Sequence, residues 1–205
     1  MKALRIFAVL AVFGPLGTAQ AADFSDPTWP CIQRKVERMS MGLMWPIMPD
    51  ENATPDAAAQ ADITELAELL ALRRIEVAEL EDEVAAFAAT YKGDPQILTR
   101  VFAEVFDTLA QRRSRIISGI GEFSLSQIEL SEKIDSDRGE MDRLLAAETP
   151  DFDRVDALEE QIDWNQTIYT DRQQSITYLC ETPTLLEKRL YAIARLLQAQ
   201  VREDG

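Results

Sequence analysis

The sequence contains no histidine. Histidine is the commonest general base near neutral pH and the commonest zinc ligand, so its absence excludes every Ser-His or Cys-His nucleophile pair. The chain also lacks a glycine-rich phosphate loop, a dinucleotide-binding fingerprint and a G-x-S-x-G nucleophile motif. An enzyme would need a carboxylate pair, or a metal ion held only by oxygen atoms. We therefore expect a non-catalytic protein that carries no cofactor.

Cysteine is scarce as well, with only Cys31 and Cys180. No C-x-x-C spacing is present, so a redox or metal-binding thiol pair is the weaker interpretation. In an exported chain, two cysteines favour a structural disulfide. A bridge between residues so far apart in sequence would constrain the unfolded chain by roughly 4–5 kcal/mol in the loop-entropy model.

Positive charge is in short supply. The chain has 21 Lys and Arg against 36 Asp and Glu, a formal net charge of −15. Binding to nucleic acid depends on Lys and Arg displacing counterions from phosphates, so this composition predicts no nucleic-acid partner.

The N-terminus has the features of a secretory signal peptide. Lys2 and Arg5 are followed by an apolar run over 6–17, which is too short to span a membrane, and then by the small residues Ala19 and Ala21. We expect residues 1–21 to be removed near Ala21, leaving a periplasmic or secreted protein; an uncleaved anchor is the alternative. No later run is apolar enough to predict a membrane span in the mature chain.

Residues 22–58 are predicted to be irregular, because prolines interrupt them repeatedly. These prolines are Pro27, Pro30, Pro46, Pro49 and Pro55. Within this segment we expect one short helix over 31–43.

From residue 59 to 205 the chain shows the seven-residue apolar repeat of a coiled coil. In its first part, only Arg73 is out of character with the repeat, whose apolar members are Ile63, Leu66, Leu70, Val77, Leu80, Val84, Phe87 and Tyr91. Helices are predicted over 60–91, 95–147, 151–181 and 183–203, with capping residues before Pro95, Pro150 and Pro183. The repeat keeps its phase across Pro183. We therefore favour one rod kinked there over a reversal of the chain.

These helices predict an all-α fold. We expect an elongated antiparallel coiled-coil bundle, with three helices at one end and a projecting two-helix hairpin over 124–175 at the other. Cys180 is expected at the junction, where the disulfide would hold the irregular segment. Gly119 and Gly121 lie there too, and close backbone contact is the favoured reason for them.

The hairpin seam is interrupted by the polar residues Gln127, Asp137, Asn165 and Arg172. Polar seam residues weaken a coiled coil and often set its register or oligomeric state. We infer that a partner protein or a second copy completes the hairpin. Trp164 and Tyr178 are candidate anchors for that contact, together with Asn165 and Arg172.

Four methionines surround Trp45 within the irregular segment: Met39, Met41, Met44 and Met48. Thioethers suit Cu(I), but methionine more commonly fills gaps in apolar cores. The leading prediction is an interaction scaffold or tether. A copper(I) carrier and a holdase-like chaperone are the alternatives.

Overall fold

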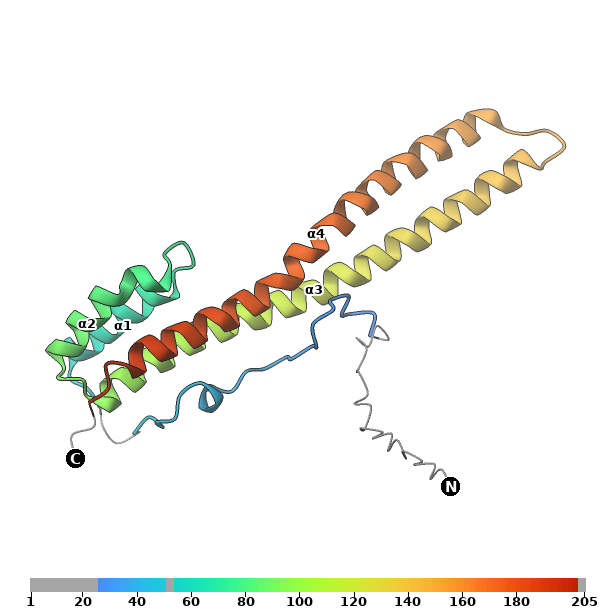
Figure 1. Ribbon diagram of the computed structural model, residues 1–205. Helices are drawn as coiled ribbons and strands as arrows, with labels where there is room; N and C mark the ends of the chain where they lie inside the picture. Colours follow the sequence, from blue (N-terminus) through green and yellow to red (C-terminus); the bar gives the residue numbers. More distant parts are fainter. Residues whose placement is uncertain (1–25, 51–53, 203–205) are drawn as a thin grey trace, which may run out of the picture.

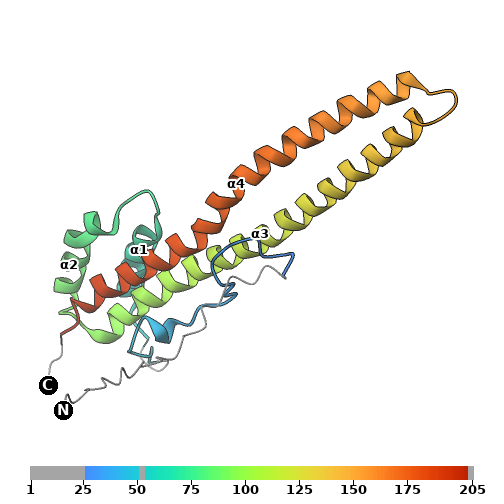
Figure 2. The same ribbon diagram turned by 45° about the vertical axis from the view of Figure 1, so that its right-hand side comes forward.

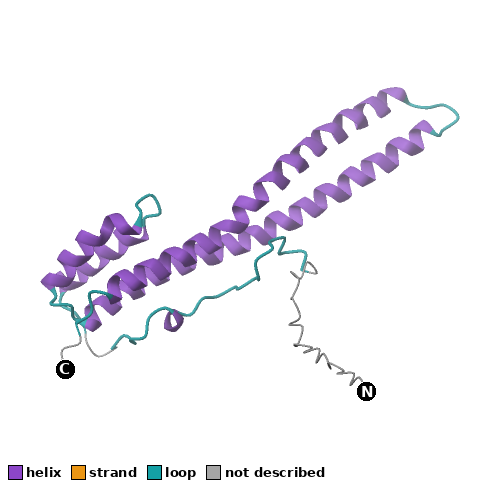
Figure 3. Ribbon diagram, viewed as in Figure 1, coloured by secondary structure: helices purple, strands orange, loops and turns teal. Residues whose placement is uncertain are grey.

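The computed structural model describes residues 26–50 and 54–202, and every regular element within them is a helix (Figure 3). The α-helices are α1 (Ala57–Ala71), α2 (Glu81–Thr90), α3 (Pro95–Leu145) and α4 (Phe152–Gln198), with the short 3-10 helices η1 (Met41–Leu43) and η2 (Val77–Leu80). The all-α prediction is therefore confirmed for this part of the chain. The predicted signal peptide lies outside the described residues.

The two long helices, α3 and α4, pack against each other in opposite directions (Figures 1 and 2). Arg113 of α3 hydrogen-bonds Glu187 of α4, and further along Asp137 accepts a hydrogen bond from Gln161. Along this contact the residue numbers of α3 increase while those of α4 decrease, as an antiparallel hairpin requires. Its outer part, carrying the turn between the helices, projects away from α1 and α2 (Figure 1).

Helix α4 runs without interruption through Pro183, so the chain does not reverse at this residue, which was the less favoured alternative. Proline removes one backbone donor and crowds the preceding turn, which bends a helix. The ribbon changes direction between its orange and red halves (Figure 1). The kinked rod was thus the better of the two interpretations.

The capping predictions held at one of three sites. Asp94 caps α3, accepting hydrogen bonds from the backbone N–H groups of Gln96 and Ile97, and Pro95 is the first helical residue. At the hairpin turn, Asp151 rather than Thr149 is the cap, because its carboxylate accepts from the Arg154 N–H. No helix begins at Pro183.

The predicted continuous helix over 60–91 was wrong. The chain leaves the helix at Leu72 and resumes it through η2 and α2. The Arg189 guanidinium of α4 donates to the carbonyls of Leu70 (2.9 and 2.7 Å) and Ile75 (2.7 Å), which satisfies acceptors that the break leaves without helical partners. The single predicted helix is therefore replaced at this end by α1, η2 and α2, all of which contribute residues to the core.

This break also reverses the direction expected for the first helix. Gln60 donates to Glu104, while Arg112 contacts the carbonyl of Ala71. Residue numbers in α1 and in α3 increase in the same direction along this contact, so α1 runs parallel to α3. Ile63 consequently lies in the main core of the body.

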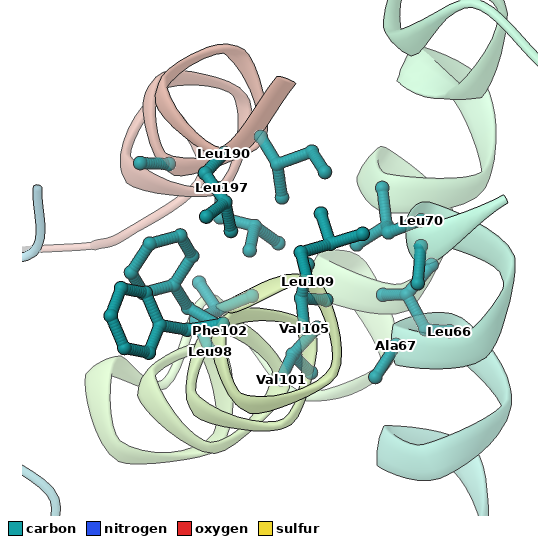
Figure 4. Close-up of a cluster of buried hydrophobic side chains, with 14 of the residues drawn as sticks. Leu66, Ala67, Leu70, Leu98, Val101, Phe102, Val105, Leu109, Leu190 and Leu197 are labelled. Carbon is teal, nitrogen blue, oxygen red and sulfur yellow. The ribbon is translucent and has the colours of Figure 1, made fainter. Parts of the chain in front are cut away.

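The main core lies where α1, α3 and α4 meet. In Figure 4, leucine, valine and phenylalanine side chains from these helices point toward one another. Leu70, Leu98, Leu109 and Leu190 have no exposed surface. Seven-residue spacing places such residues on one stripe of each helix, and their burial is the main force that holds the body together.

Residues 26–50 form an extended strap along α3 (Figure 1). The Ser124 hydroxyl donates to the Pro27 carbonyl, Arg113 donates to the Val36 carbonyl, and Asp50 is held by Gln96. Strap numbers rise as α3 numbers fall, so the two run antiparallel. The predicted helix over 31–43 was wrong, because only Met41–Leu43 is helical.

Trp45 secures the far end of the strap. Its side chain is 1% exposed, its ring stacks on Phe102 at a centroid distance of 4.9 Å, and its indole N–H donates to the Thr99 hydroxyl at 2.9 Å. Burial of the ring and satisfaction of its one donor together make this tryptophan an anchor.

A disulfide joins Cys31 to Cys180 and secures the near end of the strap, as predicted. Both cysteines are buried in a small cluster with Trp29, Ile117 and Ile120. Gly121 lies against the strap: a Cβ there would come within 3.4 Å of the Thr28 carbonyl oxygen. The same explanation fails for Gly119, where a Cβ would meet nothing within 4 Å.

Candidate interaction surface of the helical hairpin

Three of the four polar seam residues are buried between α3 and α4. Gln127, Asp137 and Asn165 are each 9% exposed, whereas Arg172 is exposed. Gln127 donates to the Tyr169 carbonyl at 3.1 Å, but its Oε1 has no partner, and neither does Nδ2 of Asn165. An unsatisfied buried polar atom costs free energy, so this part of the seam is weakly held.

Asp137 is better satisfied. Its carboxylate accepts hydrogen bonds from Lys133 at 2.8 Å and Gln161 at 2.7 Å. The hydrogen bond from Lys133 is the main cause that lowers the pKa of the Asp137 carboxyl; partial burial opposes it, and the bond from Gln161 reinforces it. The carboxylate is thus held in its charged form within the seam and ties α3 to α4.

Nearer the turn, Arg154 of α4 forms an ion pair with Glu140 of α3 at 2.9 Å. Both side chains are roughly half exposed, and ion pairs of this kind contribute little to stability. The outer hairpin therefore depends on a few leucine, isoleucine and valine contacts, among them Ile134, Val155 and Leu158.

On the outer side of α4, three large apolar side chains face solvent. Trp164 is 68% exposed, Tyr178 is 75% exposed and Leu185 is 48% exposed. Their positions differ by multiples of seven, so at 3.6 residues per turn they lie on one side of the helix. Asp171, also exposed, occupies the remaining position of this outer stripe. A coiled-coil seam has two apolar positions in every seven residues, and this stripe supplies one such row.

Carboxylates surround Trp164. Asp156, Glu159, Glu160 and Asp163 line a shallow hollow of about 560 Å³ together with Trp164 and Thr167. None of the four carboxylates has an ion-pair partner among the residues that the structure describes. The surface around Trp164 therefore combines an exposed aromatic ring with unneutralised negative charge.

The other predicted site residues have different surroundings. Asn165 lies in the seam facing α3, so it does not belong to the outer stripe. Met39, Met41 and Met44 pack against the main core, which is the gap-filling role, whereas Met48 is 73% exposed. Across residues 26–50 and 54–202, no three His, Cys, Asp or Glu residues are grouped as a metal site would require.

No helix in the described part of the chain has both the length and the apolar character needed to cross a lipid bilayer.

Leu185 and the contacts of the strap were not foreseen from the sequence. Trp164, Tyr178 and Leu185 are spaced by multiples of seven in the sequence. The inner seam of α4 has the same period, so the repeat was assigned to the seam alone. The side chains that bind strap carbonyls, such as Arg113, Ser124 and Gln198, carry no sequence pattern of their own.

Comparison of the chain with protein-family models, with curated proteins and with solved structures gave no match.

Proposed function

We propose that this chain is an exported, non-catalytic protein that scaffolds or tethers a partner protein through its helical hairpin. The observation that carries the proposal is the outer stripe of α4, in which the large apolar side chains Trp164, Tyr178 and Leu185 lie exposed on one side of the helix. Large exposed aromatic side chains are typical binding anchors, because burying them on contact releases much free energy.

The chemistry of this surface favours a helix that carries positive charge. The carboxylates around Trp164 would attract lysine or arginine side chains and speed the encounter. A cation could also lie over the exposed indole face. A second copy of this chain is the less favoured partner, because two acidic hairpins would repel each other.

Export is part of the same proposal. The signal-like N-terminus supports it, and so does the Cys31–Cys180 disulfide, because such bonds persist in oxidising compartments. No contact among residues 26–50 and 54–202 favours the copper(I) carrier or the holdase-like chaperone.

The proposal is tested by changing the anchors singly in the full-length protein. Trp164→Ala and Tyr178→Ala should each reduce co-purification of the partner from the producing cells, without lowering the thermal unfolding midpoint. Tyr191→Ala is the matched control, since Tyr191 is a partly exposed aromatic residue on the same helix but on the body. Equal recovery of a partner with all three variants would contradict the proposal. Light scattering of the purified protein separates a partner from self-association.

A further inference from the structure

The part of the strap over residues 34–40 has an unpaired backbone. It contains neither helix nor turn, and Ser40 has the φ and ψ of an extended strand, −114° and 126°. Within the described residues, none of the N–H groups over 34–39 has a hydrogen-bond partner. Only the Val36 carbonyl in this stretch accepts a bond, from Arg113 at 2.6 Å. Backbone donors and acceptors without partners are what the edge of a β-sheet presents to an additional strand.

The peptide bond between Val36 and Glu37 shows which way these groups point. A trans peptide bond places its N–H opposite its C=O, and the described chain has no cis bond. Because the Val36 carbonyl points toward Arg113 of α3, the Glu37 N–H points away from α3. Every second residue of an extended chain presents its N–H and C=O groups on the same edge. Residues 35, 37 and 39 therefore form an edge turned away from α3, where a second strand would pair.

The side chains of this segment indicate what the second strand would carry. Lys35 and Met39 are partly buried, whereas Arg34, Val36 and Arg38 are exposed. Since side chains of a strand alternate between its two faces, these three exposed residues share one face. That face presents a cation, an apolar group and a cation at every second position. Residues directly opposite each other on paired strands favour opposite charges and apolar pairs. The complementary strand is therefore acidic, apolar and acidic at the same spacing.

Positive charge on this surface lacks partners. Arg34, Arg38 and Arg115 of α3 form no ion pair within the part of the chain that the structure describes. They remain unpaired although the chain carries 36 acidic residues against 21 basic ones. Arg38 and Arg115 together line a hollow of about 470 Å³ beside Met39, and none of its lining residues is acidic. Arginine binds carboxylates through two parallel N–H groups, so this surface is suited to acidic side chains.

We propose that strap residues 34–40 are a docking edge for an extended acidic segment of a partner protein, which adds as a β-strand and places carboxylates on the unpaired arginines. The strap is already held at both ends, by the disulfide and by Trp45, so little conformational entropy is lost when a strand pairs with it. Nucleic acid is disfavoured as the occupant because the whole chain is strongly acidic. The edge lies beside α3 on the body (Figure 1), so this proposal does not depend on the outer stripe of α4.

The test uses the intact, disulfide-bonded protein and a fluorescein-labelled peptide, Ser-Glu-Thr-Val-Thr-Glu-Ser, with binding followed by fluorescence polarisation. The peptide should bind saturably, and the same peptide with lysine in place of glutamate should not. Arg38→Glu and Arg115→Glu should each weaken binding about fivefold, because each replaces an attractive charge pair with a repulsive one. Lys92→Glu makes the same charge change at an exposed position between α2 and α3. Since salt screens distant charges, this control should alter affinity less than about twofold. Trp164→Ala should leave peptide affinity unchanged.

Two changes at one position isolate the contribution of the backbone. Glu37→Pro removes the N–H that points away from α3, whereas Glu37→Ala keeps it, and both remove the same carboxylate. That N–H has no partner within the described residues, so neither change should lower the thermal unfolding midpoint. The Glu37→Pro protein should nevertheless bind the peptide about fivefold more weakly than the Glu37→Ala protein, because one hydrogen bond is lost.

Three results would overturn the proposal. Equal affinities of the two Glu37 variants would mean that charge alone holds the peptide and that no strand is added. No saturable binding up to about 1 mM peptide, or equal binding of the lysine peptide, would mean that the edge does not receive an acidic segment. Tighter, Arg38-dependent binding of an oligothymidylate would assign the surface to nucleic acid instead.

Discussion

Arg113 of α3 donates a hydrogen bond to Glu187 of α4 at 2.7 Å, and its other nitrogens reach the Val36 carbonyl of the strap and the same carboxylate. The Arg113 side chain is 4% exposed. A single guanidinium thus joins the two long helices and the extended segment that crosses them. Its five N–H donors in a fixed plane suit it to this task.

Arg113→Ala should lower the free energy of unfolding by about 3 kcal/mol, because it removes one partner of a largely buried ion pair and leaves the Val36 carbonyl without its donor. Chemical denaturation measures the change. Arg115→Ala, an exposed arginine on the same helix, should change stability by less than about 0.5 kcal/mol. If Arg113→Ala lowers the free energy of unfolding by no more than Arg115→Ala does, the three-way contact contributes little.

Asn165→Leu should stabilise the protein by about 1–2 kcal/mol, since it replaces a buried amide whose Nδ2 has no partner with an apolar side chain of similar size. The neighbouring exposed change Gln166→Leu is the control and should have little effect. Thermal melts of both proteins test this. Destabilisation by Asn165→Leu would mean that the amide has a structural role that its contacts do not explain.

Asp137 predicts a specific response to acid. Its pKa is lowered in the folded state, chiefly by Lys133, so folding favours the ionised carboxylate. The stabilisation is present in full above the unfolded pKa of about 3.9 and is lost as the pH falls through the lower folded value. Asp137→Asn should therefore flatten the fall in denaturant midpoint below about pH 4. Asp135→Asn, at an exposed position, should leave the slope nearly unchanged. Parallel acid curves for all three proteins would refute this assignment.

Gly93→Ala should cost about 1–3 kcal/mol, because Gly93 has a φ of 70° and a Cβ there would come within 2.6 Å of the Gln200 carbonyl oxygen. Gly139→Ala is a control expected to act in the opposite sense. It lies inside α3 with open space around it, so the added methyl should stabilise the helix by roughly 0.5–1 kcal/mol. Two changes of the same sign would contradict this reading of Gly93.

The Cys31→Ala, Cys180→Ala double variant should lose about 2–5 kcal/mol, because the disulfide closes a loop of 149 residues in the unfolded chain. It should also expose the near end of the strap to protease before the helical body is cut. Reduction of the original protein should reproduce both effects. Unchanged cleavage of the strap would indicate that Trp45 and Arg113 hold it without the covalent bond.

The long helices and the disulfide could be predicted because each has a local signal. The seven-residue repeat and the Asp94-Pro95 cap define most of α3, and two cysteines leave only one possible pairing. The phase of the repeat across Pro183 correctly indicated one rod. Such patterns are formed by residues close together in the chain, so they can be recognised in the sequence itself.

The break after Ala71 was missed although Arg73 signalled it. That residue falls on the apolar repeat, yet in the structure it is exposed in the loop between α1 and η2. The carbonyl groups at the break are bound by Arg189, which lies more than a hundred positions away. A contact between residues so far apart in the chain leaves no local sequence pattern. The extended course of 31–40 has the same origin, because it is held by side chains of α3 and α4 rather than by local propensity.

For the candidate site, the sequence indicated Trp164, Tyr178 and the polar seam, but not which seam residues a partner could reach. Asn165 was included among the partner contacts because it interrupts the seam, yet in the structure it is buried between α3 and α4. Adjacent positions on a helix are rotated by about 100° from each other, and here that rotation separates a buried seam residue from an exposed one.

The central claim, that the outer stripe of α4 receives a partner, is tested most directly by site-specific photo-crosslinking in the cells that make this protein. A photoreactive phenylalanine analogue would replace Trp164, Tyr178 or, as the control, Tyr191. The account predicts the same discrete adduct from positions 164 and 178 and none from position 191. No adduct from the first two positions, or equal adducts from all three, would contradict it.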